Sequence, residues 1–269
     1  MSRSLLILTH NVVSLRAAPS SDAEQVSQGI MGDVAEAQSE SEDYVRLLTR
    51  DGYEGWALTR HTAPFDPSAP AIPNTLSPLP GQQAVSVPIA DARDAGTKLV
   101  FGTPVLLIGA GAHTVRVRLA NGFETDLSED TVAPESRGAP PDPERLVSLA
   151  RMFLGTPYLW GGGSSFGFDC SGFVQRIYAF AGLVLPRDAY LQAENPLGVR
   201  LEISDGLCAG DLVFFAGDSD PLQRRITHVG LATGAHSFIH ASGKDGVIET
   251  ALSDPYYARI RCGALRIRV

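Results

Sequence analysis

Two proline-rich stretches divide this sequence, so it is expected to fold as separate segments rather than around one continuous core. The first covers residues 64–80 and the second residues 133–143. Proline has a fixed φ and no backbone N–H, which favours extended linkers over packed elements. The stretches leave segments of roughly 60, 50 and 125 residues, sizes typical of two small domains and a larger one. We therefore predict domains at 1–66, 81–134 and 142–269, with a linker at 67–80.

The first two segments repeat one pattern at a constant spacing. Gly32 matches Gly102, and at the same offset residues 45–47 and 51–54 match residues 115–117 and 121–124. Both copies place Asp-Gly or Asn-Gly between alternating apolar runs, which predicts a hairpin with a two-residue type I′ turn. The pattern predicts two short all-β modules, each folded as a small barrel. The alternative is chance similarity between two generic hairpins.

The third segment begins with helices and continues with strands. Asp142 can cap a helix with Pro143 at its first position, and Gly155 and Pro157 end that helix. After the glycine-rich loop YLWGGGSSFGFD, a second helix is predicted to begin at Cys170. Strand-like runs follow at residues 212–215, 228–232, 237–241, 247–250 and 265–269. Helices first and an antiparallel sheet afterwards predict an α+β domain.

Charge and cysteine content exclude several classes of protein. The chain of 269 residues has a formal net charge of -8, which disfavours nucleic-acid and anionic-membrane surfaces. Cys170, Cys208 and Cys262 are far apart and odd in number, so neither a disulfide framework nor a zinc knuckle is indicated. The apolar stretch 5–8 is too short for a signal sequence, and no run is long enough to span a membrane. We expect a soluble, cytoplasmic protein with no nucleic-acid or membrane partner.

Cys170 is the strongest candidate for chemistry. It follows Asp169, which is placed to cap the predicted helix, so the thiol lies in the first helical turn. Unpaired N–H groups and the helix dipole favour a thiolate there, and the thiolate is the nucleophilic form of cysteine. The preceding loop contains small, aromatic and glycine residues that allow a substrate to approach closely. The alternative is a buried structural cysteine.

Two histidines are candidate partners for Cys170. His228 lies in the run THVGLA and His240 in the next run, SFIHAS. Alternation along strands allows both side chains to face the same side of a sheet packed on the Cys170 helix. This arrangement would combine a nucleophile on a helix end, a base on a strand and a polar group that orients the base. The alternative for each histidine is a structural role.

Four ordered motifs resemble one family of enzymes. YLWGGGSSFGFDCSGFVQ, GDLVFF at 210–215, ITHVGL at 226–231 and FIHAS at 238–242 resemble the NlpC-type cysteine peptidases over most of residues 142–269. The paired N-terminal modules resemble bacterial SH3-type domains. The three-part layout is similar to that of γ-D-glutamyl-L-diamino acid endopeptidases, which act on cell-wall peptides. The resemblance implies a papain-like catalytic domain, with helices packed on an antiparallel sheet, preceded by two small SH3-like β-barrels.

The resemblance also implies the catalytic residues. Cys170 matches the family nucleophile, His228 the general base and His240 the polar residue that orients the base. Tyr158 matches a tyrosine that lines the site and helps to hold the developing oxyanion. Its alternative is an aromatic core residue. No metal or cofactor is implied.

Substrate contacts are implied in two parts of the chain. Ser171 and Asp188 match substrate-contacting positions, whereas Ala189 stands where the family often carries a serine, which puts one substrate hydrogen bond in doubt. In relatives the first SH3-type domain closes the site, and an acid and a tyrosine from it hold the ammonium of the peptide. Tyr53 and Glu24 are the candidates here, with hairpin packing as the alternative for Tyr53. Other candidates are Asp22, Glu54 and Trp56.

The implied reaction is hydrolysis of the γ-D-glutamyl–diamino acid bond in short muropeptides with a free N-terminal L-Ala. Its cellular role would be turnover or recycling of wall fragments. One alternative is another cysteine amidase or acyltransferase of the same superfamily. Another is a non-catalytic protein that binds wall peptide, and a third is a Cys/His zinc site. The sequence leaves open which diamino acid is used and what oligomeric state the protein adopts.

Overall fold

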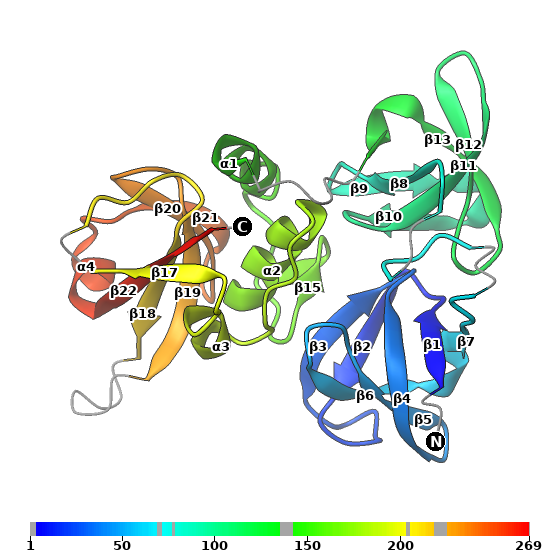
Figure 1. Ribbon diagram of the computed structural model, residues 1–269, viewed down its shortest axis with the longest axis horizontal. Helices are drawn as coiled ribbons and strands as arrows, with labels where there is room; N and C mark the ends of the chain where they lie inside the picture. The colour runs from blue at the N-terminus through cyan, green and yellow to red at the C-terminus, as the bar shows by residue number, and fades with distance from the viewer. Residues whose placement is uncertain are drawn as a thin grey trace. The chain divides into compact units, whose positions relative to one another are not determined.

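The computed structural model describes residues 4–68, 72–76, 79–134, 142–202, 205–217 and 225–268. The chain divides into two compact units, Met1–Glu135 and Ser136–Val269, and each is described by itself (Figure 1). Within the described ranges, no helix is both long enough and apolar enough to cross a membrane.

The first unit opens with an all-β module. Its strands are β1 (Leu5–Leu8), β2 (Val12–Arg16), β3 (Gln25–Ile30), β4 (Val34–Ser41), β5 (Tyr44–Leu48), β6 (Glu54–Leu58) and β7 (Thr62–Pro64). They form one antiparallel sheet in the order β3-β2-β6-β5-β4-β1-β7, with the short helix η1 (Thr59–His61) before β7. Alternate residues of these strands, such as Val13 and Leu15, point inward and are buried.

A second β module follows in the same unit. Its strands are β8 (Gln82–Val85), β9 (Ile89–Ala92), β10 (Thr97–Val100), β11 (Pro104–Ala110), β12 (Thr114–Arg118), β13 (Glu124–Ser128) and β14 (Val132–Ala133). The short helices η2 (Arg93–Ala95) and η3 (Glu129–Thr131) lie between them. The sheets β13-β12-β11-β8-β14 and β10-β9 repeat the strand order of the first module. Strands β11, β12 and β13 each begin 70 residues after β4, β5 and β6, which confirms the predicted repeat.

The repeated hairpins do not contain the predicted type I′ turns. Leu48 pairs with Glu54, and between them the Gly52 N–H donates to the Thr49 carbonyl at 2.9 Å. Gly52 has φ +80, but Asp51 is not among the described residues with positive φ, as a type I′ turn would require. The Asp51 carboxylate instead accepts from the Tyr53 N–H at 3.4 Å, which stabilises an ordinary turn followed by a left-handed glycine.

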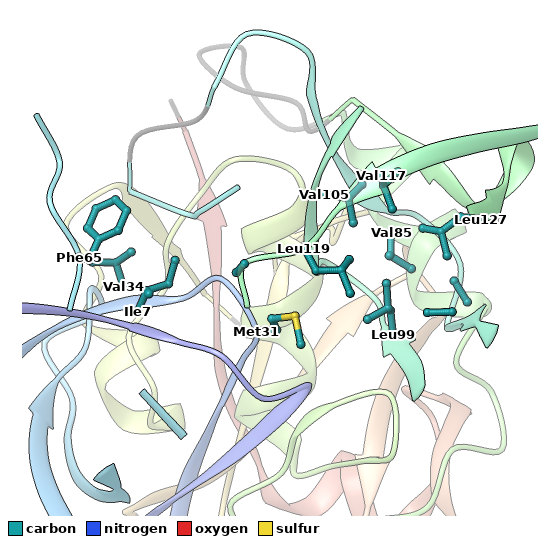
Figure 2. Close-up of a cluster of buried hydrophobic side chains, with 13 residues drawn as sticks. Ile7, Met31, Val34, Phe65, Val85, Leu99, Val105, Val117, Leu119 and Leu127 are labelled. Carbon is teal, nitrogen blue, oxygen red and sulfur yellow. The ribbon is translucent and has the colours of Figure 1, made fainter. Parts of the chain in front are cut away.

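One apolar cluster contains side chains of both modules, while a second cluster belongs to the first module alone. Figure 2 shows side chains of the first module, among them Ile7, Met31 and Phe65, in the same cluster as Val85 and Leu119 of the second. At the junction, a Cβ on Gly32 would lie 2.3 Å from Pro104 Cγ, so the close approach of the modules requires glycine there. The modules predicted at 1–66 and 81–134 therefore lie in one compact unit.

Residues 69–71 and 77–78 of the predicted linker at 67–80 lie outside the described residues, and its described part around Asn74 is packed rather than simply extended. Asn74 is fully buried, although its backbone lies outside any strand. The Gln82 side chain supplies the missing partners, because its amide oxygen accepts from the Asn74 N–H at 3.1 Å and its amide nitrogen donates to the Asn74 carbonyl at 2.8 Å. A side chain that satisfies both backbone groups allows this stretch to be buried. Most of the second proline-rich stretch lies outside the described residues.

The second unit combines helices with an antiparallel sheet. Its helices are α1 (Pro143–Arg151), α2 (Cys170–Phe180), α3 (Ala189–Ala193) and α4 (Pro255–Ile260). A short hairpin, β15 (Gly163–Ser164) and β16 (Gly167–Phe168), precedes α2. The main sheet has the order β17-β22-β18-β19-β20-β21, made of β17 (Gly198–Leu201), β18 (Leu212–Ala216), β19 (Ile226–Ala232), β20 (Ser237–Ser242), β21 (Gly246–Ala251) and β22 (Arg261–Ile267). Helix α2 packs on β19 and β20, and α1 and α2 lie on one side of the sheet (Figure 1).

The sequence patterns located α1, α2 and β18 to β21 but not every element. The last strand covers Arg261–Ile267 instead of 265–269, and Ala264 and Leu265 are both buried. Strict alternation fails there because these two adjacent residues, whose side chains point to opposite faces of the sheet, are both covered. The sequence analysis also missed α3, α4 and β17, each of at most six residues.

Candidate active site

Helix α2 begins at Cys170, as predicted. The Asp169 carboxylate caps it by accepting from the Gly172 N–H at 2.7 Å. The glycine-rich loop passes so close that a Cβ on Gly172 would lie 2.1 Å from the Gly162 carbonyl oxygen. The Asp169 N–H also donates to that carbonyl, at 3.1 Å. Cap and loop together fix Cys170, which is 8% exposed, at the first position of the helix.

A buried ion pair supports this helix start. Arg187 is 2% exposed and binds both carboxylate oxygens of Asp169, while its Nη1 also donates to Ser171 Oγ at 3.0 Å. The backbone carbonyl of Ser171 accepts from Gln192 Nε2 at 3.0 Å. The sequence analysis missed Arg187, although it lies beside Asp188 in the PRDA run. The predicted substrate contact of Ser171 stays a prediction, because its hydroxyl already binds Arg187.

Cys170 lies against β19 on both sides of His228. Its Sγ is 3.9 Å from the Thr227 carbonyl oxygen, and the backbone N–H of Val229 also forms a hydrogen bond to the sulfur. The strand residue between these two contacts is His228. The structure therefore places the thiol of the predicted nucleophile against the backbone that carries the predicted base.

His228 and His240 face each other, as the strand pattern predicted. Nε2 of His228 lies 2.8 Å from Nδ1 of His240, and Nε2 of His240 lies 3.1 Å from Thr250 Oγ1. Gly230, in the ITHVGL run, makes room for Phe238, on which His240 stacks, since a Cβ there would lie 2.5 Å from Phe238 Cδ2. Because Nε2 of His228 contacts His240, a role as base toward the thiol, which stays a prediction, would fall to Nδ1. Sequence reasoning did not identify Thr250.

Burial sets the protonation of this pair. It raises the pKa of the Cys170 thiol to about 11, with a smaller contribution from the Asp169 carboxylate. Burial also lowers the pKa of His228 to about 4, and burial and the neighbouring His228 lower the pKa of His240. The helix N-terminus favours a resting thiolate, whereas burial of the sulfur favours the protonated thiol. The directions of the two pKa shifts thus favour a thiol beside a neutral imidazole as the resting pair.

This protonation state predicts a broad pH profile for hydrolysis. The kcat/KM should stay level between about pH 5 and pH 9, and fall as the pH drops through about 4, because His228 must be neutral to accept the thiol proton. Initial rates of peptide hydrolysis across pH 3–10 measure the profile, with circular dichroism at each pH to detect unfolding. A basic limb below about pH 9 would indicate a thiolate–imidazolium pair instead.

Tyr158 is close enough to Cys170 for the two side chains to interact electrostatically. A bridge between Tyr158 and Phe168 holds it, and the neighbouring Leu159 N–H donates to the Phe168 carbonyl at 3.0 Å. Burial, followed by the proximity of Cys170, raises the pKa of Tyr158 to about 12. The phenol therefore keeps its proton at neutral pH and can donate a hydrogen bond near the sulfur.

For the other predicted substrate-binding residues, the structure gives a position in the fold. Asp188 lies at the N-terminal end of α3 and makes no side-chain capping bond. Tyr53 and Glu24 belong to the first unit. Tyr53 lies in the turn of the β5–β6 hairpin, immediately before β6, and Glu24 is exposed immediately before β3. Their contact with a substrate ammonium stays a prediction. The rival acid Glu54 already forms an ion pair with Arg46.

No group of three His, Cys, Asp or Glu side chains in the described ranges is arranged to hold a metal ion.

Known families match both units of the chain. The NlpC/P60 family matches residues 155–266, and the bacterial SH3 domain matches residues 11–63. A γ-D-glutamyl-L-lysine dipeptidyl-peptidase of Bacillus cereus is 28% identical over 252 residues, which are 89% of this chain and 74% of the relative. A protein of the same name from Bacillus subtilis is 42% identical over 125 residues, 46% of this chain and 40% of the relative.

A third relative covers the catalytic unit. A probable endopeptidase of Haemophilus influenzae is 39% identical over 123 residues, 43% of this chain and 73% of the relative. The crystal structure of an NlpC/P60 family protein from Bacillus cereus matches 99% of this chain and 100% of its own, with a TM-score of 0.83 and 24% identity, a likeness that establishes the fold. The chain therefore belongs to the NlpC/P60 family of cysteine peptidases, with a bacterial SH3 domain ahead of the peptidase domain.

Proposed function

We propose that this protein hydrolyses the γ-D-glutamyl–diamino acid bond of short muropeptides that carry a free N-terminal L-Ala. The observation that carries the proposal is the contact of Cys170 with β19 on both sides of His228, whose ring is held by His240. The names of the two Bacillus relatives support a γ-D-glutamyl bond as the target.

The reaction follows from the positions of these side chains. Cys170 Sγ attacks the γ-carbonyl carbon while its proton passes to Nδ1 of His228. The oxyanion that forms is stabilised by Tyr158 and by the backbone N–H next to Cys170. When the C–N bond breaks, His228 returns the proton to the leaving amine, and a thioester remains on Cys170. Water, deprotonated by His228, then releases the γ-D-glutamyl product and restores the thiol.

The first unit supplies selectivity in this proposal. The second β module repeats the strand order of the first, which supports its assignment as a second SH3-type domain. Tyr53 and Glu24 of the first module are the proposed partners of the substrate ammonium. A charge in a closed pocket costs several kcal/mol unless it is paired, so a carboxylate such as Glu24 is needed there.

The proposed setting is turnover of wall fragments inside the cell. Cys170, Cys208 and Cys262 form no disulfide, as is typical of proteins in a reducing compartment, which supports the predicted cytoplasmic location.

The free-amine requirement provides the test of this function. L-Ala-γ-D-Glu-L-Lys and its diaminopimelate counterpart should be cleaved to L-Ala-D-Glu and the free diamino acid. The N-acetylated forms should show a kcat/KM at least about 100-fold lower, because acetylation removes the charge and adds bulk. Products are identified by mass and rates by amine release. N-methyl-L-Ala peptides serve as the control, since they add bulk but keep the charge. Equal kcat/KM for free and acetylated peptides would support a general wall amidase instead.

A further inference from the structure

Thr250 lies where it can control the histidine pair. It pairs with Phe238 across β20 and β21, while His240 pairs with Ile248. Thr250 and His240 are therefore diagonal neighbours on one face of the sheet. Thr250 Oγ1 lies 3.1 Å from Nε2 of His240, the ring nitrogen farther from His228.

The rest of the His240 environment is aromatic. His240 is fully buried, stacks on Phe238 with ring centroids 4.7 Å apart, and meets the edge of Tyr257 at 4.9 Å. The Tyr257 hydroxyl forms a hydrogen bond with Ser242. The contacts of the two His240 ring nitrogens in the described residues are thus His228 on one side and Thr250 on the other.

Two directions are possible for the hydrogen bonds through this chain. In the productive direction, Nε2–H of His228 donates to Nδ1 of His240, and Nε2–H of His240 donates to the Thr250 hydroxyl. Nδ1 of His228 then carries a lone pair for the thiol proton. In the reverse direction, Nδ1–H of His240 donates to His228, which places the His228 proton on Nδ1. That nitrogen cannot accept a proton from Cys170.

We propose that Thr250 is a positioning residue that selects the productive direction by accepting the Nε2–H of His240. The inference rests on the proposed roles of Cys170 and His228 but not on the identity of the substrate. A buried N–H without an acceptor costs more than an imidazole lone pair without a donor, so loss of the hydroxyl favours the reverse direction. Thr250 is partly exposed, so its own hydroxyl proton can be donated to water.

The test compares Thr250→Val with Thr250→Ser. Valine keeps the shape of threonine without the hydroxyl, and it should lower kcat about 10- to 100-fold with little change in KM. Serine restores the hydroxyl and should return kcat to within about 3-fold of the original. Thr233→Val is the matched control. Thr233 is also partly exposed, but it binds Ser237 and Glu249 rather than a histidine, so its loss should leave kcat unchanged.

A tautomer measurement separates this role from a merely structural one. With ¹⁵N-labelled histidine, the ring nitrogen shifts of His240 should show the proton on Nε2 in the original protein and in T250S, and on Nδ1 in T250V. Unchanged tautomers and unchanged kcat in T250V would overturn the proposal. If Cys170→Ala or His228→Ala left hydrolysis intact, the proposed catalytic residues would be wrong instead. If T250V does not fold, T250S decides the question, and the Nδ1–H tautomer of His240 in T250S would contradict the role.

Discussion

Replacing His228 by alanine is expected to lower kcat by about 10³-fold or more. The pKa of the Cys170 thiol is raised to about 11, so very little thiolate exists at pH 7 and the attack depends on a base. His228 is the imidazole placed between the two strand contacts of Cys170. The measurement is single-turnover hydrolysis of the tripeptide, which reports the chemical step separately from product release.

Two further variants define the role of His228. His240→Ala should reduce kcat less, because His240 orients the base without touching the thiol. His236→Ala is the control, since His236 is exposed and its backbone carbonyl, which accepts from the Leu252 N–H, is unaffected by the change. A larger loss in His240→Ala than in His228→Ala would reverse the roles assigned to the two histidines.

Replacing Arg187 by methionine is expected to reduce the free energy of unfolding by about 3 to 5 kcal/mol. The change leaves the Asp169 carboxylate buried without its cation, and an uncompensated buried charge is strongly destabilising. Arg46→Met is the matched control. Arg46 and Glu54 form an ion pair with side chains 45% and 42% exposed, so its loss should cost less than about 1 kcal/mol. Urea titration followed by circular dichroism measures both values.

A double variant tests the cause of the loss. Asp169→Asn combined with Arg187→Met removes the uncompensated carboxylate charge and should recover part of the lost free energy of unfolding. A double-mutant cycle quantifies this recovery. Equal losses in R187M and R46M would show that the Asp169 pair is no stronger than a surface pair.

Local chemistry made the helix start and the nucleophile predictable from sequence. Asp169 before Cys170 and Asp142 before Pro143 are capping patterns that depend on a few adjacent residues, and both caps are present. The pairing of His228 with His240 was predictable only as a possibility, since alternation gives the face of a strand but not the register between strands.

Properties that depend on distant residues could not be read from the sequence. The capping pattern at Asp169 gives no indication that Arg187 pairs with it from 18 residues away. The helix end that favours a thiolate at Cys170 is visible in the sequence, whereas the burial that raises the pKa of its thiol is not. Thr250 acquires its role only when β21 pairs with β20.

The apolar cluster that joins the two β modules limits where the chain can be cut to separate them. Met31 and Phe65 of the first module pack with Val85 and Leu119 of the second, in addition to the cluster that the first module forms by itself. A cut at residue 66 therefore divides an apolar cluster that both modules build. Removing residues 1–66 would leave apolar side chains of the second module in water, and any resulting change in substrate selection would be confounded with its unfolding. The boundary between the compact units of this protein therefore lies after both copies rather than between them.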